Sequence, residues 1–157
     1  IIAKKYGAIV LSTSQDEGQT AAVERSVEIL DARGITRMLV IPGDVPLVTV
    51  EEIQIVLELH EKAPSMTIVP ARDELGSNCI ALSPPTAAPL RFGPNSYFPH
   101  LETARKLGLA LQTPKLPGLG LDIDTPEDLL ELSRQTVRTR AQEYLLKRNI
   151  VERLNNK

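Results

Sequence analysis

Three aspartates have the residue type and spacing of a metal-phosphate site. Asp122 and Asp124 lie two positions apart in the run Leu121–Asp124, and residues i and i+2 of a strand project to the same face. Two carboxylates at that distance repel each other, and a divalent cation relieves the conflict. Carboxylate and phosphate oxygens are the ligands that Mg²⁺ prefers. Asp44 sits in the turn Gly43-Asp44-Val45-Pro46 after another apolar run, where Gly43 lets the backbone approach a ligand.

Two of these acids have a purely structural alternative. Asp44 is equally well explained as a turn residue that satisfies its own loop. Asp124 precedes Thr125-Pro126-Glu127-Asp128, a strong helix start, and could help to cap that helix. Asp122 has no such alternative, because it interrupts an expected apolar strand. Together the three acids predict a metal-phosphate site built from two strand ends.

Two loop segments supply groups that complement such a site. Gly76-Ser77-Asn78 precedes an expected strand, and Arg91-Phe92-Gly93-Pro94-Asn95-Ser96 precedes an expected helix. Backbone N–H groups and a serine at a helix N-terminus favour an anion through the helix dipole. Ser96 could also be a plain N-cap, and the two roles are compatible.

The elements that must position these residues alternate between strands and helices. Apolar runs predict strands at 8–11, 38–41, 67–69, 79–82, 109–112 and 121–124. Helical spacing and cap residues predict helices from 19 to Gly34, from 50 to about 64 after the capping box Thr49-x-x-Glu52, from 99 to 107, and from 126 to the chain end. Residues 12–18 form a loop between the first strand and the first helix. This order predicts a three-layer α/β sandwich around a mostly parallel sheet, in one domain over residues 1–157. Ligands in such sheets collect beyond the carboxyl ends of the strands.

Composition excludes several classes of protein. The chain has 157 residues, 42% of them hydrophobic, and a formal charge of −2, which argues against disordered, collagen-like and disulfide-rich chains. A single cysteine forms no internal disulfide, and we expect a cytoplasmic protein. No apolar run reaches the ~20 residues that span a bilayer, so no membrane partner is expected.

Charge is concentrated toward the end of the chain. Residues 133–157 carry seven Lys or Arg against two Glu. A solvated helix face explains this better than nucleic-acid binding, because no aromatic or Gly-rich element interleaves the charges. These last helices, over 126–157, are also where a homodimer could form. The chain begins with Ile1 already inside what looks like structure, so we expect the natural start to be missing.

With these segments assembled, the sequence resembles the guanylyltransferases of coenzyme F420 biosynthesis, which act on 2-phospho-L-lactate or phosphoenolpyruvate. The resemblance rests on residues 43–47, 76–78, 91–96 with His100, and 118–129. The Asp-x-Pro-Leu turn and the Asp-x-Asp-Thr-Pro-Glu-Asp segment are shared with the wider nucleotidyltransferase superfamily. The Phe-Gly-Pro-x-Ser-x-x-x-His segment is the narrower signal for the F420 branch.

The resemblance implies transfer of GMP from GTP to the phosphate of a small phosphorylated acid, with release of pyrophosphate. The acceptor would be phosphoenolpyruvate, 2-phospho-L-lactate or 3-phosphoglycerate. The residues it implies fall into three groups: Asp44, Asp122 and Asp124 would hold Mg²⁺; Asn78, Gly93, Ser96 and His100 would hold the acceptor; Gly18, Gln19 and Thr20 would lie near the guanosine.

One departure from the family pattern and several alternatives stay open at this point. The superfamily begins with a strand and a basic or Gly-containing loop for the triphosphate, and this chain has no such loop. A nucleotidyltransferase for a sugar phosphate or molybdopterin is one alternative, and a non-catalytic phosphometabolite-binding module is another. His100 is equally well explained as a helix-packing residue.

Overall fold

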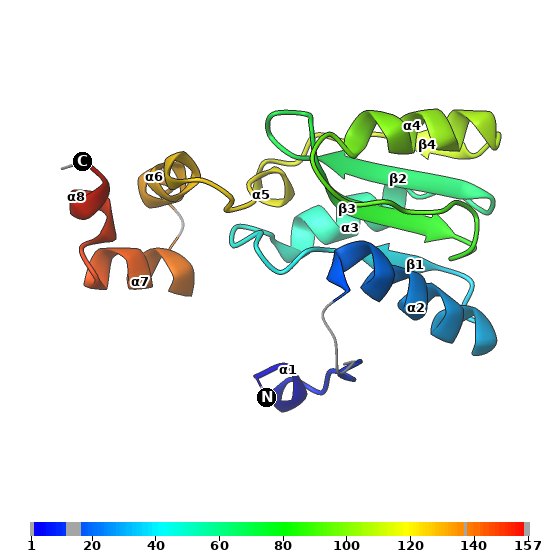
Figure 1. Cartoon of the computed structure of the whole chain (residues 1–157), viewed down its shortest axis with the longest axis horizontal. Helices are drawn as coiled ribbons and strands as arrows, with labels where there is room; N and C mark the ends of the chain where they lie inside the picture. The colour runs from blue at the N-terminus through cyan, green and yellow to red at the C-terminus, as the bar shows by residue number, and fades with distance from the viewer. Residues whose placement is uncertain (1, 12–16, 137, 156–157) are drawn as a thin grey trace.

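A computed structural model describes residues 2–11, 17–136 and 138–155. The elements are α1 (Ile2–Lys5), α2 (Gly18–Ala32), β1 (Met38–Val40), α3 (Val50–Leu59), β2 (Ser65–Pro70), β3 (Ser77–Ser83), α4 (Tyr97–Lys106), β4 (Ala110–Gln112), α5 (Pro117–Gly120), α6 (Pro126–Arg134), α7 (Arg140–Lys147) and α8 (Ile150–Asn155). The α/β class is as predicted, and four of the predicted strands are present (Figure 1).

The sheet has the strand order β1-β3-β2-β4 and is parallel only in part. β3 runs antiparallel to both of its neighbours, β1 and β2, while β2 and β4 are parallel. The short loop between β2 and β3 explains the difference, because a tight connection joins antiparallel strands and a parallel pair needs a longer crossover. That crossover exists between β3 and β4, where α4 intervenes.

Alternation along the strands divides the core into two layers. On one face, Ile68 and Ile80 belong to a cluster with α4 and with the partly buried apolar side of α2. On the other, Val69 and Cys79 pack with Val56 of α3 and with α5. The sheet therefore lies between two helical layers, as the three-layer prediction requires (Figure 1).

The C-terminal segment forms three short helices around a small core that also includes Leu121. Leu132 and Leu145 are buried there, and Figure 1 shows α6, α7 and α8 grouped at one end of the molecule, next to α5. The basic continuation predicted for the helix that begins at 126 is divided into the separate helices α7 and α8. The Gln142 amide donates to the Leu132 carbonyl (3.2 Å) and the Gln135 carbonyl (2.6 Å), while Thr139 caps α7. These bonds stabilise a turn where a single helix would have continued.

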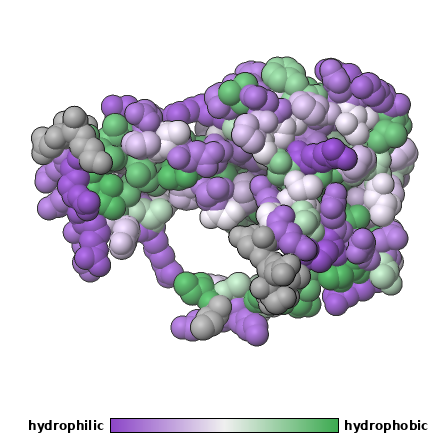
Figure 2. All heavy atoms as spheres, viewed as in Figure 1, coloured by the Kyte–Doolittle hydropathy of each residue, from purple (hydrophilic) through white to green (hydrophobic). Residues whose placement is uncertain are grey.

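The first predicted strand is also wrong, because residues 8–11 pair with no described strand. Ile9 is 73% exposed and Leu11 is 54% exposed. An apolar run forms a strand only where a neighbour accepts its backbone hydrogen bonds. Figure 2 shows the N-terminal segment standing away from the body. Most of the loop predicted at 12–18 lies outside the described residues.

In the parts of the chain that the structure describes, no helix combines the length and the apolar character that a membrane span requires.

Candidate active site

A cavity of about 380 Å³ lies where the carboxyl ends of β1 and β2 meet the start of β3. We call it the acidic cavity, because Asp44, Asp73, Asp122 and Asp124 line it. Five segments contribute to its lining: Gln19 of α2; Pro42 and Asp44 after β1; residues 71, 73 and 75–78 between β2 and β3; residues 92–96 before α4; and Asp122 and Asp124 after α5. This is the sheet edge at which ligands were expected.

The structure places the three predicted metal-binding acids in one cavity, although two of them do not lie on the strand that was predicted to carry them. Residues 121–124 form no strand; the Ile123 N–H donates to the Asp44 carbonyl (3.1 Å) as an isolated bond. The segment is confined between α5, which ends directly before it, and α6, which begins at Pro126. Asp122 and Asp124 nevertheless line the same cavity as Asp44.

The electrostatics of these acids reflect their closeness. Partial burial, followed by the charges of Asp122 and Asp44, raises the pKa of Asp124 above its ordinary value. Among the described residues, the carboxylates of Asp44, Asp122 and Asp124 make no side-chain hydrogen bond, and no lysine, arginine or histidine lines the acidic cavity. An anionic ligand would therefore meet only negative side-chain charge unless a cation accompanied it.

Oxygen donors of this kind fit Mg²⁺. The observation that favours a cation is the lining of the acidic cavity, in which four aspartates meet no cationic side chain among the described residues. The described side chains do not, however, form a ready group of three His, Cys, Asp or Glu spaced to hold a metal ion. The three acids share the cavity without a finished coordination geometry.

The loop that precedes α4 lines the same cavity as the acids. Gly93 has φ 146° and Asn95 has φ 61°, so the chain turns sharply here in a conformation that favours glycine. Ser96 occupies the N-cap of α4 but makes no capping hydrogen bond. Its hydroxyl donates instead to Ser77 Oγ (3.3 Å), while the Tyr97 N–H donates to the Leu75 carbonyl (2.9 Å).

His100 lies behind this loop and does not face the cavity. It is 2% exposed. The Arg91 N–H donates to Nε2 (3.0 Å), so the neutral ring carries its proton on Nδ1 and donates to Ser77 Oγ (3.0 Å). Burial lowers the pKa of His100, which favours this neutral form. Both ring nitrogens have protein partners, so the structure contradicts direct contact of His100 with the acceptor and favours the packing alternative.

Asn78, by contrast, lies on the cavity wall as predicted. Its side chain is buried, and Nδ2 donates to the Leu119 carbonyl of α5 (3.0 Å). Asn78 therefore ties the start of β3 to the segment that carries the acids.

Only one of the three residues predicted to lie near a guanosine lines the acidic cavity. Gln19 lines the acidic cavity, whereas Gly18 and Thr20 do not. Thr20 Oγ1 instead accepts from the Phe92 N–H (3.0 Å) and donates to the Phe92 carbonyl (3.5 Å), which ties α2 to the loop before α4.

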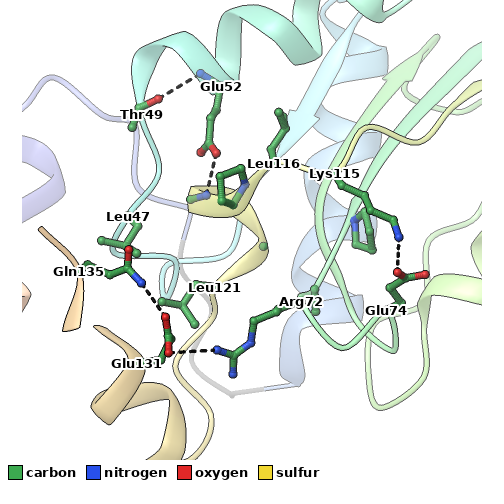
Figure 3. A pocket seen from close by; sticks show the side chains of 15 residues that line it. Leu47, Thr49, Glu52, Arg72, Glu74, Lys115, Leu116, Leu121, Glu131 and Gln135 are labelled. Atoms are coloured by element: carbon green, nitrogen blue, oxygen red, sulfur yellow. Dashed lines mark hydrogen bonds and ion pairs between the residues drawn. The ribbon is translucent and has the colours of Figure 1, made fainter. Parts of the chain in front are cut away.

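A second and larger cavity, of about 610 Å³, lies on the α3 and α5 side of the sheet (Figure 3). Its lining is mostly apolar, and its charged groups are already paired. Arg72 bonds to Asp128 (2.9 Å), and Lys115 pairs with Glu74. None of the predicted site residues lines it.

Comparison with known proteins shows the family to which the chain belongs. The family model described as guanylyl transferase CofC like matches residues 3–155. The chain belongs to this CofC-like family. A phosphoenolpyruvate guanylyltransferase of Rubrobacter xylanophilus is 32% identical over 78% of the chain and 56% of that protein. A 3-phospho-D-glycerate guanylyltransferase of Colwellia psychrerythraea is 36% identical over 82% of the chain and 60% of that protein.

A 2-phospho-L-lactate guanylyltransferase of Methanothermobacter thermautotrophicus is 32% identical over 92% of the chain and 63% of that protein. The CofC-like chain thus spans a little more than half the length of the curated relatives it matches. Among solved structures, a nucleotide-diphospho-sugar transferase of Desulfovibrio desulfuricans superposes with a TM-score of 0.67 at 21% identity, over 88% of this chain and 63% of that one. At that identity the likeness shows the fold alone.

The sequence reasoning missed two residues of the acidic cavity. Ser77 accepts from His100 and Ser96, which leaves its own hydroxyl hydrogen to donate to a ligand. Its place in the Gly76-Ser77-Asn78 segment was the available signal. Asp73 also lines the cavity, with one carboxylate oxygen accepting from the Leu75 N–H (2.9 Å); its position just past β2 was the signal for it.

Proposed function

We propose that this chain transfers GMP from GTP to the phosphate of a small phosphorylated acid, with Mg²⁺ and with release of pyrophosphate, in coenzyme F420 biosynthesis in the cytoplasm. The observation that carries the proposal is the acidic cavity, which is lined by four aspartates, by the polar loop before α4 and by no described cationic side chain. The names of the family's relatives support the reaction, and supply three candidate acceptors: phosphoenolpyruvate, 2-phospho-L-lactate and 3-phospho-D-glycerate.

The acids would hold the metal, and the opposite wall would hold the acceptor. Asp44, Asp122 and Asp124 supply the oxygen donors. When bound, Mg²⁺ neutralises the charge between two phosphates that would otherwise repel. Ser77 would donate its hydroxyl hydrogen to the phospho-acid, and Asn78, Gly93 and Ser96 would form the wall around it.

Little proton transfer is required of the protein. An acceptor phosphate is already ionised at neutral pH, so its oxygen can attack the α-phosphorus of GTP directly. The bond between that phosphorus and the oxygen bridging to the β-phosphate breaks, and pyrophosphate leaves with the electron pair. The chain's own groups align the two phosphates for in-line attack, which is the main contribution that such a site makes.

The test is release of pyrophosphate by the purified protein. GTP and Mg²⁺ are supplied with each of the three candidate acceptors in turn, and a sugar 1-phosphate serves as the comparison acceptor. We expect release with at least one phospho-acid and much less with the sugar phosphate. Absence of release with every phospho-acid would sink the proposal, and preference for the sugar phosphate would favour a different nucleotidyltransferase.

A further inference from the structure

Glu52 carries a buried carboxylate whose role differs from the one its sequence position predicts. The pattern Thr49-x-x-Glu52 predicts a capping box, in which the glutamate side chain would return to the N-cap backbone. Only half of that box forms: Thr49 Oγ1 accepts from the Glu52 N–H (3.1 Å). The Glu52 side chain turns instead toward α5, as Figure 3 shows, and the residue is 7% exposed.

Both oxygens of this carboxylate bind backbone groups of α5. Oε1 accepts from the Gly118 N–H (2.7 Å), and Oε2 accepts from the Leu119 N–H (2.9 Å). A buried carboxylate is costly unless such bonds satisfy it, and charge-assisted bonds to N–H groups are among the stronger hydrogen bonds in proteins. Glu52 therefore fixes α5 against the start of α3.

The packing at Gly118 shows how close this contact is. A Cβ atom placed on Gly118 would overlap both the Glu52 carboxylate and the Leu47 carbonyl oxygen. α5 thus rests directly on the loop that follows Asp44, and only glycine leaves room for the approach.

The two segments that Glu52 joins, α3 and α5, are each next to a segment that lines the acidic cavity. On one side, the loop from Asp44 to Thr49 runs straight into α3. On the other, α5 is followed at once by Leu121 and the acids Asp122 and Asp124. Two further bonds bridge the sides: Asn78 Nδ2 donates to the Leu119 carbonyl, and the Ile123 N–H donates to the Asp44 carbonyl.

We propose that Glu52 is a positioning residue that sets the placement of Asp44 relative to Asp122 and Asp124, and thereby the metal affinity of the acidic cavity. The inference rests on the proposed function, because it takes these three acids as the metal ligands. Glu52 lines the larger cavity and not the acidic one, so it acts through α5 and not by contact with the metal or substrate.

The experiment measures Mn²⁺ binding to the purified protein by electron paramagnetic resonance, without turnover. Glu52→Gln keeps the size of the side chain but places an NH₂ group against a backbone N–H. We expect it to weaken Mn²⁺ binding about tenfold, the low end of the effect seen for groups that orient metal ligands. Glu52→Asp keeps the charge but is one methylene shorter, and we expect an intermediate loss. If Glu52→Gln does not fold, Glu52→Asp carries the test.

Thr49→Ala is the matched control for a merely structural effect. It removes the N-cap of the same helix and lowers the melting temperature, but it leaves the bonds between Glu52 and α5 in place. We expect its Mn²⁺ affinity to equal that of the wild type. Equal Mn²⁺ affinity in the folded Glu52 variants, or an equal loss in Thr49→Ala, would overturn the inference.

Asp122→Asn separates this inference from the proposed function. If Asp122→Asn abolishes Mn²⁺ binding and the Glu52 variants do not weaken it, the role of Glu52 is wrong and the metal site stands. If Asp122→Asn binds Mn²⁺ as the wild type does, the metal assignment fails, and the inference about Glu52 fails with it.

Discussion

The carboxylates around α5 fall into two groups that differ in what surrounds them. Glu52 binds two backbone N–H groups, and Asp128 accepts from the Thr125 N–H (2.9 Å), the Thr125 hydroxyl (2.7 Å) and the Asp124 N–H (3.3 Å). Asp44, Asp122 and Asp124 make no side-chain hydrogen bond within the described residues. The acids of the first group stabilise the fold. Those of the second repel one another and remain available to a ligand.

Asp122→Asn should show the difference between the two groups of carboxylates most clearly, because it should change turnover much more than stability. The change removes one of the proposed metal ligands, and we expect turnover to fall roughly 100-fold or more, because metal ligation supplies several kcal/mol of transition-state stabilisation. The free energy of unfolding should stay the same or rise slightly without metal, since a repulsion with Asp124 is removed. Pyrophosphate release and chemical denaturation check the two effects.

Glu127→Gln is the control for that change. Glu127 is an exposed acid of the first turn of α6 and does not line the acidic cavity. It should leave turnover within a factor of about two, as surface substitutions away from special features generally do. A comparable loss in both variants would show that general negative charge, and not ligation, is what matters at this edge.

The sequence predicts the positions of these groups better than the elements that carry them. β1, β2, β3 and β4 coincide with apolar runs, because buried strands leave a signal that depends only on neighbouring residues. The acidic cavity also contains the predicted acids and Ser96, since it forms at the sheet edge where the strands deliver their loops.

Failures arise where a residue's partner is far away in the sequence. Residues 121–124 resemble a strand locally, but the structure gives them a single backbone bond to Asp44. Glu52 satisfies a local capping pattern, yet its carboxylate binds groups 66 and 67 positions away. The role of His100 likewise depends on Ser77 and Arg91. Spacing along the chain carries no information about such contacts.

Ser77→Ala tests a residue that shares features of both groups: it is fixed by hydrogen bonds within the fold, and it also lines the cavity. Ser77 is held by His100 and Ser96, yet it lines the acidic cavity. Losing a hydroxyl that donates to an anion should raise KM for the acceptor about tenfold, in line with the 1.5–3 kcal/mol typical of hydrogen bonds to charged groups. We expect KM for GTP to change much less.

The control for Ser77 is Ser133→Ala, whose hydroxyl donates only to the Leu130 carbonyl of its own helix (2.6 Å). It should leave both KM values unchanged. An unchanged acceptor KM in Ser77→Ala would mean that the serine supports His100 and does not contact the ligand.

Asp128→Ala should affect stability more than activity. The burial of Asp128 raises its pKa, but the hydrogen bonds from Thr125 and Asp124 and the charge of Arg72 outweigh burial and lower the pKa overall. Loss of the capping box should cost about 1 kcal/mol in the free energy of unfolding. Turnover should fall far less than in Asp122→Asn.

The pH dependence of that loss gives a second check. A carboxyl group whose pKa is lower in the folded state stabilises the protein above its unfolded pKa of about 4. The stabilisation is lost as the pH falls through the folded pKa. Denaturation curves of the wild type and Asp128→Ala should therefore differ most near neutral pH and converge in acid. A constant difference at all pH values would show that the charge of Asp128 contributes nothing.

The smallest expected effect is the pH dependence that His100 gives to folding. Burial lowers its pKa in the folded state, so the unfolded chain binds more protons just below the ordinary pKa of about 6.5. Stability should therefore fall as the pH drops below that value, by at most about 1.4 kcal/mol per pH unit for one proton. His100→Gln should flatten this slope. The slope should not vanish, because burial and the charge of Arg37 also lower the pKa of His60, and His60→Gln should remove a separate share. If His100→Gln leaves the slope intact, the ring is not held neutral between Arg91 and Ser77.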